Sequence, residues 1–391
     1  MATNLVVEFQ SSSDGSSWSA GTPGLVASDG SPVYYRATLT PTGGTVTFTN
    51  VILVNRAAGS PAHVRLENSP DLTSWSTALS GTYDVTGSKE FFRVKEDDTS
   101  PEFVSVQGGT VDVDGTDVTV SDFQIGRFEV TQELWDGVYN WALSSGSGYS
   151  FSNNGGGNWN TSTCVNAVHP VNLLNWYDAV KWCNARSEKE GLTQVYYTDA
   201  GFTTPYVAGD VVPSLLFVKT DADGYRLATL DEWYYAANGG QLSQGYTYSG
   251  SNTAADVARY VSTSLGSDCP IFPAPSDYGA WAAGSLLPNE LGIYDMSGNI
   301  KEWILEGPSD ALRFAAGGAY LGSTTLVEAT FNSLEQASIL STDDGQIGLR
   351  LARNAPAPEA AVSFESASSD RIKKGKRNEA AQAKIKPGKL K

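Results

Sequence analysis

Cysteine and histidine are the residue types best suited to nucleophilic or transition-metal chemistry, and this chain has few of either. It contains three Cys and two His in 391 residues, with Cys164, Cys183 and Cys269 far apart in the sequence. Three scattered cysteines make no disulfide framework, and two histidines leave almost no nitrogen ligands for zinc or iron. Cys183 lies on the apolar side of an expected helix, where an inert buried thiol is the usual state. A three-histidine iron centre is therefore excluded within this chain.

A second chemically capable group lies in one short turn, SGNIKEW, residues 297–303. The side-chain amide oxygen of Asn299, the carbonyl of Ile300 and the carboxylate of Glu302 are oxygen ligands of the kind that calcium prefers. The turn therefore predicts a structural calcium ion, which would brace the fold and would not catalyse a reaction. The alternative is that Gly298 and Asn299 only make the turn, while Glu302 forms an ion pair at the surface.

Three amphipathic segments are expected to form the helices that position these residues. Thr131, Asn175 and Thr229 have the residue type of N-caps, and the helices should run to about residues 142, 191 and 239. The apolar residues at helical spacing are expected to belong to the core and not to contact a cofactor. They are Trp135, Val138, Trp176, Val180, Cys183, Trp233 and Ala236.

The first hundred residues contain an internal repeat. VEFQSSSDGSSWS from Val7 aligns with VRLENSPDLTSWS from Val64, and YYR at Tyr34 aligns with FFR at Phe91, each with an offset of 57 residues. Alternating apolar and polar residues before an Asp turn predict two small β modules, residues 1–57 and 58–100. Such modules could act as spacers that present the remainder of the chain, or they could bind a ligand directly.

Composition and charge limit the classes of function. No apolar run approaches the length of about 18–20 residues needed to cross a membrane, and the start of the chain does not have the pattern of a signal peptide. We therefore expect no membrane insertion, synthesis in the cytoplasm, and a virion or cell-surface location reached by a non-classical route. The net charge is −17, and the acidic body should repel nucleic acid.

The last part of the chain differs from the body in its charge. Residues 371–391 contain nine basic residues against Glu379, a net charge of +8, which leaves −25 on the other 370 residues. Residues 354–391 are therefore expected to form a linker and a disordered basic tail. The tail could contact an acidic partner, or it could be solvated and have no partner.

Five segments occur in order within residues 103–353. They are DFQIGRFEVTQELW (122–135), HPVNLLNWYDAVKWCNARSEKEGL (169–192), GYRLATLDEWYYAANGG (224–240), PNELGIYDMSGNIKEW (288–303) and IGLRLAR (347–353). These segments resemble the formylglycine-generating enzyme (sulfatase-modifying factor) family, whose domain is a variant of the C-type lectin fold. The resemblance implies an α+β, C-type lectin-like domain that follows the two all-β repeat modules.

The resemblance also implies what this chain lacks. In the family's active oxidases, two cysteines that bind copper follow an RGGS-like strand, and thiolate is the natural soft ligand for such a metal. The matching segment here is residues 315–332, in which Gly322 and Val327 fall at the cysteine positions. No copper and no formylglycine generation by the family's route are therefore expected. The family's structural calcium at the turn that matches residues 297–303 supports the calcium prediction.

A further resemblance predicts a ligand-binding surface. The chain is similar to the variable proteins of diversity-generating retroelements, in which the segment matching residues 320–346 forms an exposed ligand-binding face and ends in a motif similar to IGLRLAR. This chain departs from that pattern by continuing 38 residues beyond Arg353. The alternative is an ordinary loop over the core. The candidate contacts are Tyr320, Ser323, Thr324, Glu328, Asn332, Glu335, Gln336, Asp343 and Asp344.

These observations favour a non-catalytic recognition protein that displays a lectin-like domain and binds a cell-surface protein or glycan. A phage virion receptor-binding or decoration protein would fit this description. Such a protein could form homo-oligomers or contact neighbours in a virion. The alternatives are a structural protein of a larger assembly and a family enzyme with divergent chemistry.

Overall fold

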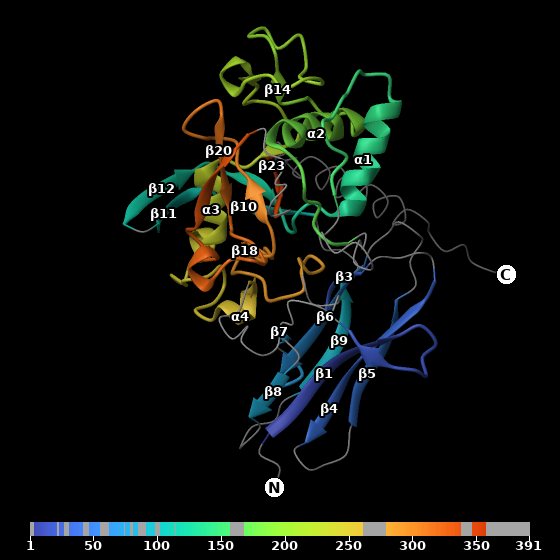
Figure 1. Ribbon diagram of the computed structural model, residues 1–391. Coiled ribbons are helices and arrows are strands. Elements are labelled where there is room, and N and C mark those ends of the chain that lie inside the picture. Colours follow the sequence, from blue (N-terminus) through green and yellow to red (C-terminus); the bar gives the residue numbers. More distant parts are fainter. Residues whose placement is uncertain are drawn as a thin grey trace, which may run out of the picture. The chain divides into compact units, whose positions relative to one another are not determined.

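The chain divides into two units, Met1–Ala355 and Pro356–Lys391. The computed structural model is shown in Figure 1. The linker and tail predicted for residues 354–391 lie outside the described residues from residue 357 onward. The residues that the structure describes are 4–21, 23–26, 31–41, 47–54, 62–73, 75–78, 81–84, 91–97, 102–113, 115–156, 168–260, 279–337 and 346–356.

The N-terminal repeats form two antiparallel sheets. One has the order β2-β1-β4-β5 with β8 also paired to β1, and the other has the order β3-β6-β7 with β9 also paired to β6. Val7, Phe9, Val64 and Leu66 are each at most 1% exposed and belong to one shared hydrophobic core. The strands are β1 (Asn4–Ser12), β2 (Ser19–Ala20), β3 (Gly24–Val26), β4 (Val33–Pro41), β5 (Thr47–Val54), β6 (Ala62–Ser69), β7 (Ser76–Ala78), β8 (Gly81–Asp84) and β9 (Phe91–Asp97).

The two copies of the repeat exchange strands. β3 of the first copy pairs with β6 of the second, and β8 of the second copy pairs with β1 of the first. Each copy thus completes the sheet of the other. Residues 1–57 and 58–100 therefore differ from the two separate modules expected, because their inward-facing side chains are buried only when both copies pack together.

Each copy also has the same stacked pair of side chains. The guanidinium of Arg36 lies 3.9 Å from the ring centroid of Trp18, and that of Arg93 lies 3.8 Å from the ring centroid of Trp75. Both arginines lie on the aromatic strands that the repeat aligns, β4 and β9. The repeated sequence therefore produces a repeated local structure.

The C-terminal domain contains two four-stranded sheets. The first has the order β10-β13-β23-β16, so that the last strand of the domain pairs with β13 near its beginning. The second has the order β21-β20-β19-β22. The strands are β10 (Phe103–Val106), β13 (Phe123–Gly126), β16 (Arg226–Leu227), β19 (Lys301–Trp303), β20 (Leu312–Ala316), β21 (Asn332–Gln336), β22 (Ile347–Gly348) and β23 (Leu351–Asn354).

Three helices begin at the expected N-caps: α1 (Gln132–Ser144), α2 (Trp176–Lys189) and α3 (Leu230–Ala237). The side chains of Thr131, Asn175 and Thr229 each accept a hydrogen bond from a backbone N–H of the first turn, and Glu232 completes a capping box with Thr229. These contacts satisfy N–H groups that have no partner within the helix. α1 and α2 pack side by side (Figure 1).

Aromatic side chains form much of the core between the helices and the sheets. The indoles of Trp135 and Trp182 stack with centroids 5.4 Å apart at 4°, and both are fully buried. Trp176, Val180 and Cys183 belong to the same core, and Trp233 to an adjoining one that contains Ala236. The expectation that the apolar helix positions belong to the core is therefore confirmed.

Shorter elements complete the domain. Among the described residues, no helix has both the length and the apolar character that crossing a membrane requires. The remaining elements are β11 (Gly109–Val113), β12 (Thr116–Val120), β14 (Tyr196–Tyr197), η1 (Pro213–Leu215), β15 (Phe217–Val218), η2 (Gly240–Leu242), α4 (Ala254–Val257), β17 (Ala258–Arg259), β18 (Ser297–Gly298) and η3 (Thr324–Leu326).

Candidate functional site

The segment after β20 contains the two residues expected in place of catalytic cysteines. Val327 is fully buried, and a Cβ built on Gly322 would lie 3.0 Å from the carbonyl oxygen of Ala319. The N–H of Gly322 donates to that same carbonyl at 2.7 Å. Neither residue can bind copper or form a thiolate, and the tight turn leaves little space for a side chain at position 322.

Cys183 is the cysteine that the structure describes, and it lies in the core. It is fully buried on α2, and burial raises the pKa of its thiol. A thiol in this state is neither a nucleophile nor a metal ligand at neutral pH. The other two cysteines lie outside the described residues.

Tyr320, the first of the predicted ligand contacts, is part of the core. It is 4% exposed and packs with Ala280 and Ile300. Its backbone N–H donates to the carbonyl of Asn299 at 2.9 Å. Tyr320 therefore supports the turn at Asn299 and does not face outward.

The next candidates lie around η3. Ser323 precedes this short helix and Thr324 begins it, and both are half-buried. Leu326 is 42% exposed. Glu328 is also half-buried, and Asp343 and Asp344 lie outside the described residues. This part of the segment presents hydroxyl groups beside an exposed apolar side chain.

The remaining candidates alternate along β21. Asn332, Leu334 and Gln336 lie on one side of the strand, which we call the outer side of β21, and Leu334 is 51% exposed there. The Asn332 amide also donates to the hydroxyl of Tyr234. Glu335 points to the opposite side, so β21 does not bring all the candidates onto one face.

Glu335 has a partner within the domain. Its Oε1 lies 2.7 Å from Nζ of Lys301, and both side chains are mostly buried. An ion pair of this kind connects β21 to β19 across the sheet. Glu335 therefore contributes to the sheet and is not available as a ligand contact.

The predicted calcium ligand Glu302 is engaged in a buried ion pair. Its Oε1 lies 2.6 Å from Nη2 of Arg350, its Oε2 accepts a hydrogen bond from Nε1 of Trp233 at 2.7 Å, and both charged side chains are 1% exposed. The guanidinium neutralises the carboxylate, so the alternative of a surface ion pair is also wrong. The ion pair holds β19, which carries Glu302, against the segment between β22 and β23, which carries Arg350.

Asn299, the second predicted ligand, has protein partners as well. Its Oδ1 accepts the backbone N–H of Trp281 at 2.8 Å, and its Nδ2 donates to Oε2 of Glu129 at 2.6 Å. The N–H of Ile300 donates to Oε1 of the same glutamate at 3.1 Å. Among the described residues, no group of three His, Cys, Asp or Glu could hold a metal ion. The arrangement does not fit a calcium ion on Asn299, Ile300 and Glu302, and we derive no role for calcium.

The residues around this turn form a buried acidic group of three carboxylates and one guanidinium, which we call the Arg350 cluster. Its members are Glu129, Asp295, Glu302 and Arg350, each at most 6% exposed. Burial raises the pKa of Glu129, and the nearby charges of Asp295 and Glu302 raise it further. Burial likewise raises the pKa of Asp295 to about 6. The one positive charge of Arg350 therefore cannot neutralise all three carboxyl groups if each of them is ionised.

Sequence reasoning assigned no role to Glu129, Asp295 or Arg350. Each lies inside one of the five family segments and is flanked by apolar residues, as in GLRLA around Arg350. A charged residue between apolar neighbours was the available signal for a buried ion pair. The partner could not be found that way, because 48 residues separate Glu302 from Arg350.

Together, the paired terminal strands and the buried ion pair between Glu302 and Arg350 define a C-type lectin-like domain, and the sequence has no cysteine after β20. The chain belongs to the family described as the sulfatase-modifying factor enzyme 1-like domain, which it matches over residues 88–355. The predicted family and the α+β fold class are confirmed.

Known proteins show similarity over most of this region. The chain is 35% identical over 279 residues to a protein named chaperone protein LppX from Paenibacillus barcinonensis, covering 65% of this chain and 90% of that protein. The crystal structure of CarF matches with a TM-score of 0.54 and 26% identity, over 65% of this chain and 98% of CarF. Treponema denticola variable protein 1 matches with a TM-score of 0.48 and 23% identity, over 70% of this chain and 98% of that one.

Proposed function

We propose that this protein recognises a protein or glycan on a cell surface through its lectin-like domain and catalyses no reaction. The proposal is supported by the turn after β20, where the family resemblance puts Gly322 and a buried Val327 at the positions of the copper-binding cysteines. The buried thiol of Cys183 cannot replace them, because its raised pKa keeps it protonated.

The surface that we assign to recognition consists of the η3 turn and the outer side of β21. Ser323 and Thr324 supply hydroxyl groups, Asn332 and Gln336 supply amides, and Leu326 supplies an exposed apolar side chain. Short polar side chains such as Ser and Asn supply adaptable hydrogen bonds at binding surfaces. Loops and edge strands on a rigid scaffold commonly carry such sites.

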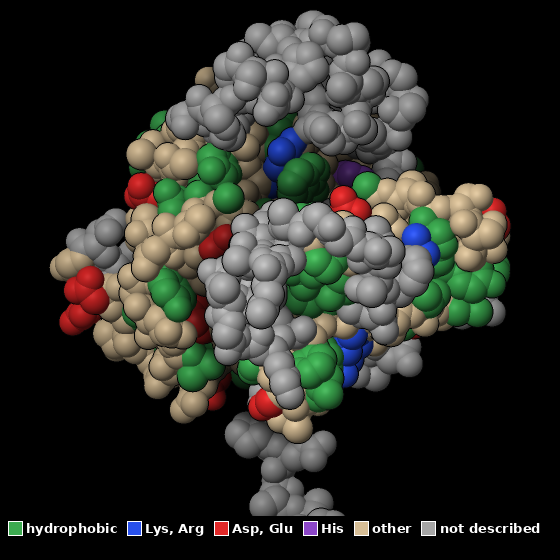
Figure 2. Space-filling model, turned by 90° about the horizontal axis from the view of Figure 1, so that it is seen from below, with side chains coloured by type: hydrophobic (Ala, Val, Ile, Leu, Met, Phe, Trp, Pro, Cys, Tyr) green, Lys and Arg blue, Asp and Glu red, His purple; other side chains and the backbone are tan. Residues whose placement is uncertain are grey.

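A protein partner receives support from the relative named as a chaperone, since a chaperone acts on other proteins. A virion or cell-surface setting, with homo-oligomers or virion neighbours, belongs to the same proposal. On the described part of the face in Figure 2, acidic and basic side chains occur at separate places and form no continuous charged patch. This distribution suits a mixed polar surface better than a surface that binds nucleic acid.

The test is binding of the full chain to intact bacterial cells and to a glycan array, with calcium and with a chelator. A variant with Ser323→Ala, Thr324→Ala and Gln336→Ala is compared with the control Asn140→Ala, which alters an exposed residue on α1. We expect saturable binding that the triple variant loses and the control keeps. Circular dichroism checks that both variants are folded.

Two outcomes would contradict the proposed recognition role or the surface assigned to it. Absence of binding to any cell or glycan, with the chain recovered in purified particles, would overturn the proposal in favour of a structural role in an assembly. Equal binding by the wild-type chain and the triple variant would place recognition on another surface. Binding unchanged by the chelator would argue against a role for calcium in recognition, in keeping with the protein partners of Asn299 and Glu302.

A further inference from the structure

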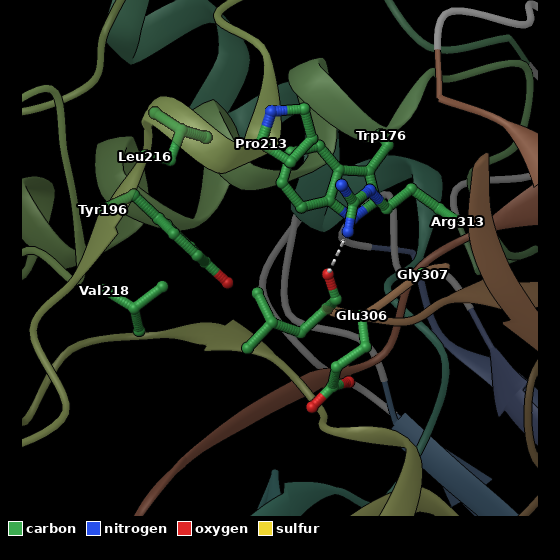
Figure 3. Close-up of a pocket in the computed structure, with 9 residues that line it drawn as sticks. Trp176, Tyr196, Pro213, Leu216, Val218, Glu306, Gly307 and Arg313 are labelled. Atoms are coloured by element: carbon green, nitrogen blue, oxygen red, sulfur yellow. Dashed lines mark hydrogen bonds between the residues drawn. The ribbon is translucent and has the colours of Figure 1, made fainter. Parts of the chain in front are cut away.

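A small pocket opens between α2, the η1–β15 segment and the connection from β19 to β20. Its volume is about 220 Å³. Aromatic rings of Trp176 and Tyr196 and aliphatic side chains that include Leu216 line it, and the guanidinium of Arg313 lies beside the indole (Figure 3). None of the residues assigned above to recognition lines this pocket.

Arg313 differs from the other buried arginines of the domain. Arg186, Arg226 and Arg350 each form an ion pair with a carboxylate, at distances between 2.5 and 2.6 Å. Arg313 is 6% exposed and forms no ion pair with any carboxylate of the described residues. A buried charge without a partner is unfavourable by several kcal/mol, and proteins seldom retain one without a use.

The guanidinium of Arg313 is only partly hydrogen-bonded within the protein. Nη1 donates to the carbonyl of Leu305 at 3.4 Å, whereas Nε is buried and has no acceptor. The cation also lies 4.9 Å from the ring centroid of Trp176. Burial lowers the pKa of the guanidinium, which reflects how poorly it is solvated. The edge formed by Nε and Nη2 can donate two parallel hydrogen bonds to one carboxylate.

The acidic groups near Arg313 are held by other donors. Asp310 accepts hydrogen bonds from the backbone N–H of Ser214 at 2.8 Å and from its hydroxyl at 2.7 Å. Glu306, which lines the pocket, accepts the N–H of Leu230 at 3.0 Å, and burial raises the pKa of its carboxyl. Glu306 is therefore part of the pocket wall and Asp310 lies outside the lining, and neither carboxylate pairs with Arg313. Their negative charge disfavours a ligand with two or more negative charges and tolerates one with a single charge.

The apolar walls indicate the remainder of the ligand. The rings of Trp176 and Tyr196 offer flat apolar surfaces, and Leu216 and Leu305 add aliphatic ones. The pocket is smaller than the roughly 300–1,000 Å³ of a site for a drug-sized molecule. It would hold a small molecule or the end of a longer chain, with one charged group beside Arg313.

From this geometry we infer that the pocket binds a monocarboxylate with an apolar body, whose carboxylate is held by Nε and Nη2 of Arg313 and whose body packs against Trp176. The carboxylate could belong to a free small acid or to the C-terminus of a peptide. This inference is independent of recognition by the η3 turn and β21, and either can fail alone.

Calorimetric titration of the full chain tests whether the pocket binds a monocarboxylate. The probes are 3-phenylpropionate, its neutral amide, inorganic phosphate, and a short peptide ending in Phe with a free or an amidated C-terminus. The variants are Arg313→Gln, which removes the charge, and Leu216→Trp, which fills the pocket and leaves the guanidinium in place. The control is Lys219→Met, since this cation follows β15 but pairs with Asp221.

We expect 3-phenylpropionate to bind, its amide to bind at least ~10-fold more weakly, and both pocket variants to lose at least ~10-fold in affinity while Lys219→Met does not. Binding of only the peptide with a free C-terminus would assign the site to a chain terminus. Binding of neither carboxylate, equal binding of acid and amide, tighter binding of phosphate, or unchanged affinity in Arg313→Gln would overturn the inference.

Discussion

Arg350 and Glu302 form a fully buried ion pair across 48 residues of sequence, with Nη2 of the arginine 2.6 Å from Oε1 of the glutamate. Arg350 also donates to the carbonyl oxygens of Gly126 and Tyr294. The hydrogen bonds of Arg350 therefore connect three parts of the lectin-like domain: its beginning at Gly126, the segment from Tyr294 to Glu302, and its end. The ion pair with Arg350 thus gives Glu302 a structural role in this chain.

Replacing this glutamate should destabilise the domain strongly. We expect Glu302→Gln to lower the free energy of unfolding by about 3–5 kcal/mol, because it leaves Arg350 buried without its counter-charge. Urea unfolding followed by tryptophan fluorescence measures the loss. The control Glu335→Gln breaks the less buried pair with Lys301 and should lose only about 1 kcal/mol. Equal small losses in both variants would contradict a structural role for the buried pair.

Asp295 should make stability depend on pH. Its folded-state pKa of about 6 lies above the ordinary value of 3.8, so between these pH values the folded chain keeps a proton that the unfolded chain releases. The stability associated with this group therefore falls as pH rises through that window and stays low above it.

Asp295→Asn should remove this effect, and asparagine tolerates the φ of 58° at this position. We expect the variant to gain on the order of 1–3 kcal/mol over the wild-type chain above about pH 6 and to gain little near about pH 4. Unfolding free energies measured across this range provide the comparison. A difference between the two chains that is constant with pH would rule out titration of Asp295 as the cause.

Two buried arginines should respond in opposite ways to the same substitution. Arg313→Met removes a buried charge that has no ionic partner, so the melting temperature should rise or stay the same in the absence of ligand. Arg226→Met leaves Glu232 without its bidentate partner and should cost about 3 kcal/mol. Thermal unfolding of both variants measures the contrast, and a large loss for Arg313→Met would show that the arginine is structural.

The thiol of Cys183 should be unreactive in the folded chain. Its burial and raised pKa predict slow alkylation by iodoacetamide at pH 8 and fast alkylation after unfolding in urea. The experiment uses a Cys164→Ser, Cys269→Ser variant, so that Cys183 is the labelled thiol. Rapid labelling of the folded variant would mean that the thiol is accessible and would reopen the question of thiol chemistry.

The exchanged strands predict that the repeats fold only together. Residues 1–57 alone lack β6, the partner of β3, and lack β8, a partner of β1. We therefore expect this fragment to be unfolded by circular dichroism and residues 1–100 to show β structure. A folded fragment 1–57 would indicate that the exchange is not required.

Local signals predicted the local structure well. Thr131, Asn175 and Thr229 cap the helices as expected, because capping depends on residues within one turn. The outward or inward position of the ligand candidates was harder to predict. Tyr320 lies in the core and Glu335 pairs with Lys301, and neither fact follows from a segment rich in polar residues.

The sequence by itself determined the family, the order of the segments, the helix starts, the repeat and the absence of cysteines at positions 322 and 327, because each of these depends on residue type at a fixed spacing. The tertiary structure decided which charges meet. Arg350 pairs with Glu302 and Arg226 pairs with Glu232, whereas Arg313 lines a pocket and forms no ion pair with a carboxylate of the described residues. Pairing between charges depends on distances of a few Å between elements that chain order does not place together.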